Sequence, residues 1–218
     1  MAVVENVSRI DPCRLERLSE EVADRTAELA ARASLLGARL HPKTAESLTE
    51  LVRVMNCYYS NLIEGHNTRP REIECALAAD YDDERRDLQL EARAHIRVQS
   101  EIDRLEATGQ LIEPASKEFV CWLHREFYHD AAPAMLRVET ANGGGLELVP
   151  GEYRTHEVVV GRHQPPSSRR LDDFMSYFEQ KFALNRLKKA SQLIAMAIAH
   201  HRLNLFTLLP TATVVLAV

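Results

Sequence analysis

Histidine can act as a general base or a metal ligand near neutral pH, so the nine histidines are the first candidates for chemistry. His200 and His201 are adjacent in a segment with helical periodicity, so they point to different faces of one helix and cannot both bind one metal ion. Two further pairs also lack the spacing of a metal or catalytic site: His124 with His129, and His156 with His163. We therefore expect packing and surface roles for His200 and His201, and solvent-exposed positions for the other four histidines.

The four cysteines are the second candidates, because thiolates bind metals and act as nucleophiles. Cys13, Cys57, Cys75 and Cys121 are widely spaced and include no Cys-x-x-Cys, which is typical of neither a disulfide framework nor a zinc site. We expect reduced packing residues and no bound metal.

Composition limits the classes of protein that these residues could serve. The chain has 218 residues, 45% of them hydrophobic and 27% charged, as in ordinary globular domains. Its net charge of -5 argues against a nucleic-acid partner, which usually demands a basic face. No apolar run reaches the roughly 18 residues of a membrane span, and the apolar stretch after Met1 is too short for the core of a secretory signal, so we expect a cytoplasmic protein with no membrane partner.

Apolar residues recur at helical spacing through most of the chain and predict a mainly α fold. The predicted helices cover about 14–36, 43–63, a short segment after Thr68-Arg69-Pro70, 84–107, a segment after Pro114, 171–182 capped by Ser167 or Ser168, and a last helix from about 188. Gly37 and Gly65 are expected to end the first two helices. Helical spacing is lost between about 130 and 166, where the β-branched run 155–160 predicts a strand or hairpin arm that ends at Gly161.

The segment Ser60–Gly65 (Ser-Asn-Leu-Ile-Glu-Gly) lies at the end of the second predicted helix. It resembles the inhibitory signature Ser/Thr-x-x-x-Glu-Gly/Asn of the Fic-domain proteins, which transfer AMP or related phosphate-containing groups to hydroxyl side chains of other proteins. The resemblance implies an inhibitory helix over about 43–65, with Ser60, Glu64 and Gly65 as its signature residues. Without the resemblance, these residues are a helix end with an exposed glutamate and a capping glycine.

Residues 149–166 (Val-Pro-Gly-Glu-Tyr-Arg-Thr-His-Glu-Val-Val-Val-Gly-Arg-His-Gln-Pro-Pro) are similar to the flap of the same family. The resemblance implies a helical bundle with a short β-hairpin flap at about 148–163, which covers the nucleotide and aligns the target segment as an added strand. The alternative is an ordinary surface hairpin. The target-docking residues implied by the resemblance are Thr155, His156, Glu157, Val158, Val159, Val160 and Gly161.

A third segment, 195–204, looks like the family helix that leads into the catalytic signature His-Pro-Phe-x-Asp/Glu-Gly-Asn-Gly/Lys-Arg-x-x-Arg. Residues 205–218 contain no histidine, glycine, acid or arginine. One permitted codon spelling of Asn204 to Val218 yields Asn-Phe-Ile-His-Pro-Phe-Ala-Asp-Gly-Asn-Gly-Arg-Val-Ser-Arg when a single T is inserted after the Asn204 codon. We therefore expect a reading frame that slipped just before the active site. A membrane-seeking tail is disfavoured by its length and by Pro210, while a strand that completes the core stays open.

The resemblance implies that the intact family uses ATP and Mg²⁺, with the signature supplying a general base, a metal ligand, a phosphate nest and an arginine. None of these groups has a matching residue here, so we expect an inactive chain that binds neither cofactor productively and in which Glu64 has lost its arginine partner. The expected regions are a helical region 1–112, a truncated Fic core 113–204 and an apolar tail 205–218.

Two other functions stay open beside this one. The first is a non-enzymatic interaction or regulatory protein, and the second is a helical DNA-binding regulator, against which the acidic charge argues. The target protein is unknown, and a homo-oligomer stays open.

Overall fold

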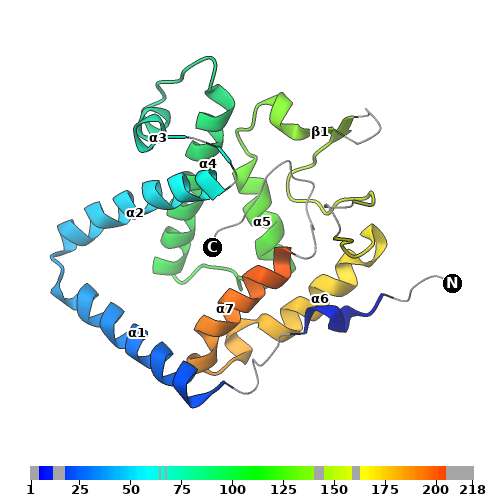
Figure 1. The fold of residues 1–218 in the computed structure, drawn as a ribbon. Coiled ribbons are helices and arrows are strands. Elements are labelled where there is room, and N and C mark those ends of the chain that lie inside the picture. Colours follow the sequence, from blue (N-terminus) through cyan, green and yellow to red (C-terminus); the bar gives the residue numbers. More distant parts are fainter. Residues whose placement is uncertain are drawn as a thin grey trace.

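Seven α-helices account for most of the described chain, which in this computed structural model comprises residues 5–11, 18–63, 65–66, 68–139, 145–158 and 163–204. The prediction of a mainly α fold is confirmed. In Figure 1, α1 and α2 diverge as the two arms of a V, while α5, α6 and α7 lie together on the other side of the molecule. Within the described residues, no helix is both long and apolar enough to cross a bilayer.

The two arms of the V are α1 (Glu20–Arg39) and α2 (Pro42–Ile63). Helix α1 begins later than predicted, where the Ser19 hydroxyl accepts a hydrogen bond from the Val22 N–H at 3.3 Å. It continues through Gly37, so the predicted end at that glycine is wrong. The break falls at residues 40–41 because Pro42 disfavours a helical backbone at the residue before it.

Helices α3 (Pro70–Leu77) and α4 (Arg86–Ala107) pack beside α2. Residue Arg69, rather than the predicted Thr68, is the N-cap of α3, and its N–H donates to the Glu72 carboxylate at 2.6 Å. Four buried residues join the three helices in one apolar cluster: Cys57, Ile73, Ala92 and Ile96. This cluster fixes the C-terminal half of α2, whereas the first half of α2 has no buried residue.

The largest core lies between α5 (Lys117–Phe127), α6 (Leu171–Phe182) and α7 (Lys189–Asn204). Phe174, Met175, Phe178 and Phe182 form its centre on the inner face of α6. Ile10, from the short 3-10 helix η1 (Val7–Ile10), is buried in the same core. The other 3-10 turns are η2 (Pro133–Leu136), η3 (Ser168–Arg170) and η4 (Leu184–Arg186). The predicted cap of the 171–182 helix by Ser167 or Ser168 is wrong, because η3 directly precedes that helix: Ser167 is the N-cap of η3, and Arg170 is the N-cap of α6.

One antiparallel hairpin is present in the described chain, formed by β1 (Arg137–Glu139) and β2 (Gly145–Glu147). The prediction placed the hairpin at 148–163 and a strand at 155–160. Residues 155–158 form no strand, and 159–161 lie outside the described residues. The physical reason is that the Arg154 side chain, rather than a neighbouring strand, bonds the His156 carbonyl. The Glu157 side chain likewise bonds Ser168 instead of facing a paired strand.

Candidate functional site

The end of α2 at Gly65 is a Schellman motif. The Gly65 N–H donates to the Leu62 carbonyl at 3.1 Å, and the His66 N–H donates to the Asn61 carbonyl at 2.8 Å. Gly65 has φ +83°, a left-handed conformation that glycine adopts without steric cost. The predicted end of the helix at this glycine is confirmed.

The remaining signature residues of this helix end are only partly described. Ser60 is half-buried on the last full turn of α2, and Glu64 lies outside the described residues. The expectation that the Glu64 carboxylate has lost its arginine partner in this chain therefore stays a prediction.

Three polar side-chain atoms beside this helix end have no hydrogen-bond partner among the described residues. They are Nδ2 of Asn61, Nδ1 of His66 and Oγ1 of Thr68, and the exposed fractions of Asn61 and Thr68 are only 5% and 1%. His66 Nδ1 lies 3.9 Å from a Glu91 carboxylate oxygen. Such atoms can bind water or a small polar group. No set of three or more metal-binding side chains gathers anywhere in the described part of the chain.

The Cys57 thiol on the inner face of α2 is not a nucleophile. Its side chain is fully buried, with Sγ 3.7 Å from the Ala92 carbonyl oxygen. Burial, together with the nearby charge of Glu91, raises the pKa of Cys57 to about 12. At neutral pH the reactive thiolate is therefore almost absent. In the described residues Cys57, Cys75 and Cys121 are free thiols, as predicted.

The segment that resembles the flap begins with a tight contact between Gly151 and α5. The buried Gly151 N–H donates to Nδ1 of the buried His124 at 2.7 Å. Gly151 has φ +84°, and a Cβ built there would lie 3.0 Å from the Cys121 carbonyl oxygen. The expectation that His124 is a solvent-exposed polar residue is wrong, because its ring is buried and accepts a hydrogen bond from a residue 27 positions further along the chain.

Arg154 holds the next part of the same segment. Its side chain is fully buried, and the guanidinium donates to the His156 carbonyl at 2.7 Å and to the Pro166 carbonyl. Burial lowers the pKa of Arg154 from its ordinary value, although the charge of Glu157 opposes that change. The arginine thus joins two parts of a loop through their backbone oxygens, in place of strand pairing.

The predicted target-docking residues are only partly brought together. The Glu157 carboxylate accepts hydrogen bonds from the Ser168 N–H at 3.0 Å and hydroxyl at 2.9 Å, which hold the pKa of that carboxyl below its usual range. Thr155 is exposed, whereas His156 and Val158 are half-buried. The other predicted residues, Val159, Val160 and Gly161, lie outside the described chain.

Helix α7 carries His200 and His201 near its C-terminal end. His201 is exposed and His200 is half-buried, so the expected separation onto different surroundings is confirmed. The predicted apolar tail, residues 205–218, lies outside the described residues.

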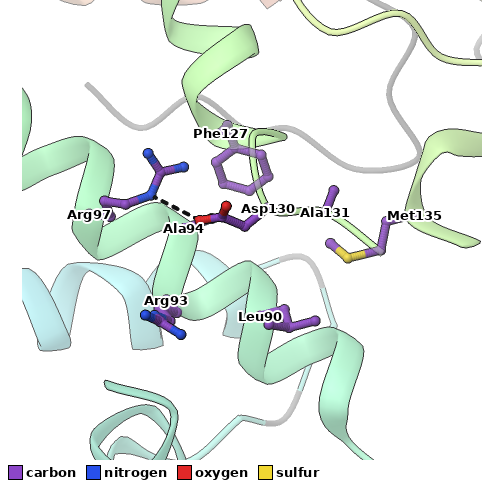
Figure 2. A pocket seen from close by; sticks show the side chains of 8 residues that line it. All are labelled: Leu90, Arg93, Ala94, Arg97, Phe127, Asp130, Ala131 and Met135. Atoms are coloured by element: carbon purple, nitrogen blue, oxygen red, sulfur yellow. Dashed lines mark ion pairs between the residues drawn. The ribbon is translucent and has the colours of Figure 1, made fainter. Parts of the chain in front are cut away.

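A cavity of about 240 Å³ lies between α4 and the C-terminal end of α5. Figure 2 shows Arg97 on α4 reaching toward Asp130, with Phe127 beside them, while Arg93 lies further along α4. Arg97 pairs with Glu126 at 3.1 Å and with Asp130 at 3.9 Å. The one carboxylate in the lining, Asp130, pairs with Arg97, and the lining holds no histidine, cysteine, serine or threonine. None of the predicted site residues contributes to this cavity.

The resemblance implies ATP and Mg²⁺ as cofactors, and the sequence after Asn204 lacks the groups by which that family would bind them. Phosphate binding needs backbone N–H groups of a glycine-rich loop that opens a helix, and Mg²⁺ needs oxygen ligands beside it. Residues 205–218, where the family would supply these groups, contain neither glycine nor acid. Comparison of the chain with protein-family models and with curated proteins found no match.

Proposed function

We propose that this chain is a Fic-type protein that does not transfer AMP in its 218-residue form. The observation that carries the proposal is the end of α2, where the residues that match the inhibitory signature finish at a glycine with φ +83°. Further support comes from the order of the three matching segments along the chain: 60–65, 149–166 and 195–204.

The loss of activity follows from the residues after Asn204. In the family, a histidine of the catalytic signature accepts the proton of the target hydroxyl, and removal of such a base alone costs about 10² to 10⁴ in rate. Residues 205–218 lack that histidine together with the glycines, the acid and the arginine of the signature. With no arginine to bind it, Glu64 has no inhibitory role in this form.

Sequencing the gene across the Asn204 codon is the direct test of a slipped reading frame. We expect that one inserted T restores His-Pro-Phe-Ala-Asp-Gly-Asn-Gly-Arg and is followed by an open frame. A downstream frame that encodes no such signature would remove the frameshift explanation.

A second test measures transfer of labelled AMP by four forms of the protein: the 218-residue chain and the frame-repaired chain, each with Glu64 or with Glu64→Gly. The chain as given should incorporate none above background, with Glu64 or with Glu64→Gly. The frame-repaired chain should be weakly active, and Glu64→Gly in that chain should raise transfer strongly, because the carboxylate competes with the terminal phosphate for an arginine. An inactive repaired chain with either residue at 64 would contradict the family assignment. Equal activity of both would contradict only the inhibitory role.

A non-enzymatic interaction protein is the second candidate function. The observation that favours it is the large exposed apolar area on α1 and α2, since monomeric proteins rarely expose such areas without a binding function. This function does not depend on the family assignment.

A further inference from the structure

Exposed apolar side chains concentrate on the two arms of the V. Ten of the fourteen exposed large apolar residues in the described chain belong to α1 and α2, and the most exposed are Leu36 at 62% and Ile63 at 77%. Single exposed leucines are normal on a protein surface, but a concentration on two neighbouring helices is not. The arms therefore need a separate explanation.

Helix α2 is apolar on two opposite faces. Its inner face carries the buried Cys57 and contacts α3 and α4. At about 100° per residue, the positions 48, 52, 55, 59 and 62 all lie within about 40° of the direction opposite Cys57. These outer residues are Leu48, Val52, Met55, Tyr59 and Leu62. A helix that is apolar on all sides is normally covered on all sides, yet four of these five side chains are exposed and Met55 is half-buried.

The outer residues of α2 follow the spacing 4-3-4-3, which is the spacing of a coiled-coil seam. Helix α1 repeats it with Val22, Thr26, Leu29, Ala33 and Leu36, and no residue of α1 is buried. We call these two seams together the apolar arm surface. Figure 1 shows that the two helices point away from each other from their junction, so neither seam is covered along its length by the other helix.

We propose that the apolar arm surface is the dimer interface of this protein, covered by the same surface of a second copy of the chain. Seven of the exposed residues belong to the two seams and together expose roughly 600 Å² of side chain, at the upper end of the largest patch on a typical monomer and close to the ~800 Å² that one partner contributes to a standard interface. A two-fold axis through this surface places the same patch on both copies, which is the usual geometry of a homodimer.

Charge also favours a second copy over other partners. The arms carry six acidic residues (four in α1 and two in α2) and five basic ones (three and two), so their net charge is -1. Two nearly neutral surfaces do not repel each other when they meet. A membrane surface or a nucleic acid would instead select a basic face, which the arms do not have.

Analytical ultracentrifugation of the full 218-residue chain over roughly 1 to 100 μM tests the proposal. The wild-type chain should sediment as a dimer at the upper end of that range. Val52→Glu and Leu29→Glu each place a charge at the centre of one seam and should weaken dimerisation at least about 100-fold. Val149→Glu is the control, because Val149 is a similarly exposed apolar residue (47%) that belongs to neither arm helix, and this variant should leave the dimer intact.

The substituted residues are exposed, so the variants should keep the wild-type circular dichroism and thermal unfolding of the monomer. A wild-type chain that stays monomeric throughout the concentration range would overturn the proposal, and would assign the surface to another segment of the chain or to a different protein. A dimer that survives both glutamate substitutions would also overturn it, because the interface would then lie elsewhere.

Discussion

Gly151 is the position where a single added methyl group should have the clearest effect on stability. The residue is buried, its φ is +84°, and its N–H donates to His124 Nδ1 at 2.7 Å. In Gly151→Ala the new Cβ would lie 3.0 Å from the Cys121 carbonyl oxygen and 3.0 Å from Arg125 Nε. The arginine side chain can move aside, but the carbonyl belongs to the backbone of α5 and cannot.

The cost can be worked from these two contributions. A left-handed backbone costs a residue with a Cβ about 1–2 kcal/mol, and displacing well-packed neighbours costs roughly 1–3 kcal/mol more. Alanine also lowers the conformational entropy of the unfolded chain, which stabilises the folded state by about 0.4–1 kcal/mol and offsets part of this loss. We expect a net loss of about 2–4 kcal/mol, which for a chain of this length lowers Tm by roughly 5–15 °C.

Urea unfolding followed by far-UV circular dichroism measures the loss, with two glycines as controls. Gly109 has φ +66° with open space around its missing Cβ, so Gly109→Ala should cost only about 1 kcal/mol. Gly37 lies inside α1 with open space, so Gly37→Ala should stabilise the helix by about 0.5–1 kcal/mol. Equal losses at Gly151 and Gly109 would refute the close approach of the turn to α5.

Three further predictions concern buried polar groups. Arg154→Lys should lower the free energy of unfolding by about 2–3 kcal/mol, because one ammonium group cannot reach both carbonyl oxygens to which the guanidinium donates. Urea unfolding measures this loss, and the control Arg169→Lys, at an exposed position, should change the free energy little. Iodoacetamide should label Cys57 only after unfolding, while the half-buried Cys75 reacts in the native protein; similar labelling rates by peptide mass spectrometry would contradict the burial. Burial lowers the pKa of His95, so the unfolded chain takes up a proton that the folded chain does not, and stability should fall as pH drops below 6.5. His95→Gln should reduce that fall. If the urea midpoint of His95→Gln drops between about pH 7 and pH 5 by as much as that of the wild type, the assignment to His95 is wrong.

The helices with strong periodicity were predictable from the sequence. For α4 the predicted bounds of about 84–107 agree closely with Arg86–Ala107, because one face carries regularly spaced apolar residues that reach the core. The end of α2 was equally predictable, since Gly65 provides the left-handed residue that a Schellman motif needs. Gly37 misled the prediction because a glycine can also adopt the helical conformation, and Pro42 further along determined the break instead.

The hydrogen bonds that hold the 149–166 segment could not be predicted. The β-branched residues after Thr155 indicate a strand, but β propensity only describes how well side chains fit a sheet that must itself be present. The buried Arg154 guanidinium donates to backbone oxygens. Every residue has such an oxygen, so the residue types along the chain do not show which carbonyls will accept these bonds. The contact of Gly151 with His124 depends on how a loop folds back on α5, a distance of 27 residues along the chain.

Helix α2 connects the two proposals without making one depend on the other. Its inner face is fixed by Ile73, Ala92 and Ile96, so the conformation of the Ser60–Gly65 end depends on packing against α3 and α4. Four of the five residues of the outer seam are exposed. We therefore expect that a partner can bind to or leave this seam without moving the inner face. A charge at Val52 should therefore separate the dimer while Cys57 stays protected from alkylation. Loss of both together would mean that the partner also maintains the inner packing, and that α2 requires the second copy in order to keep its place beside α4.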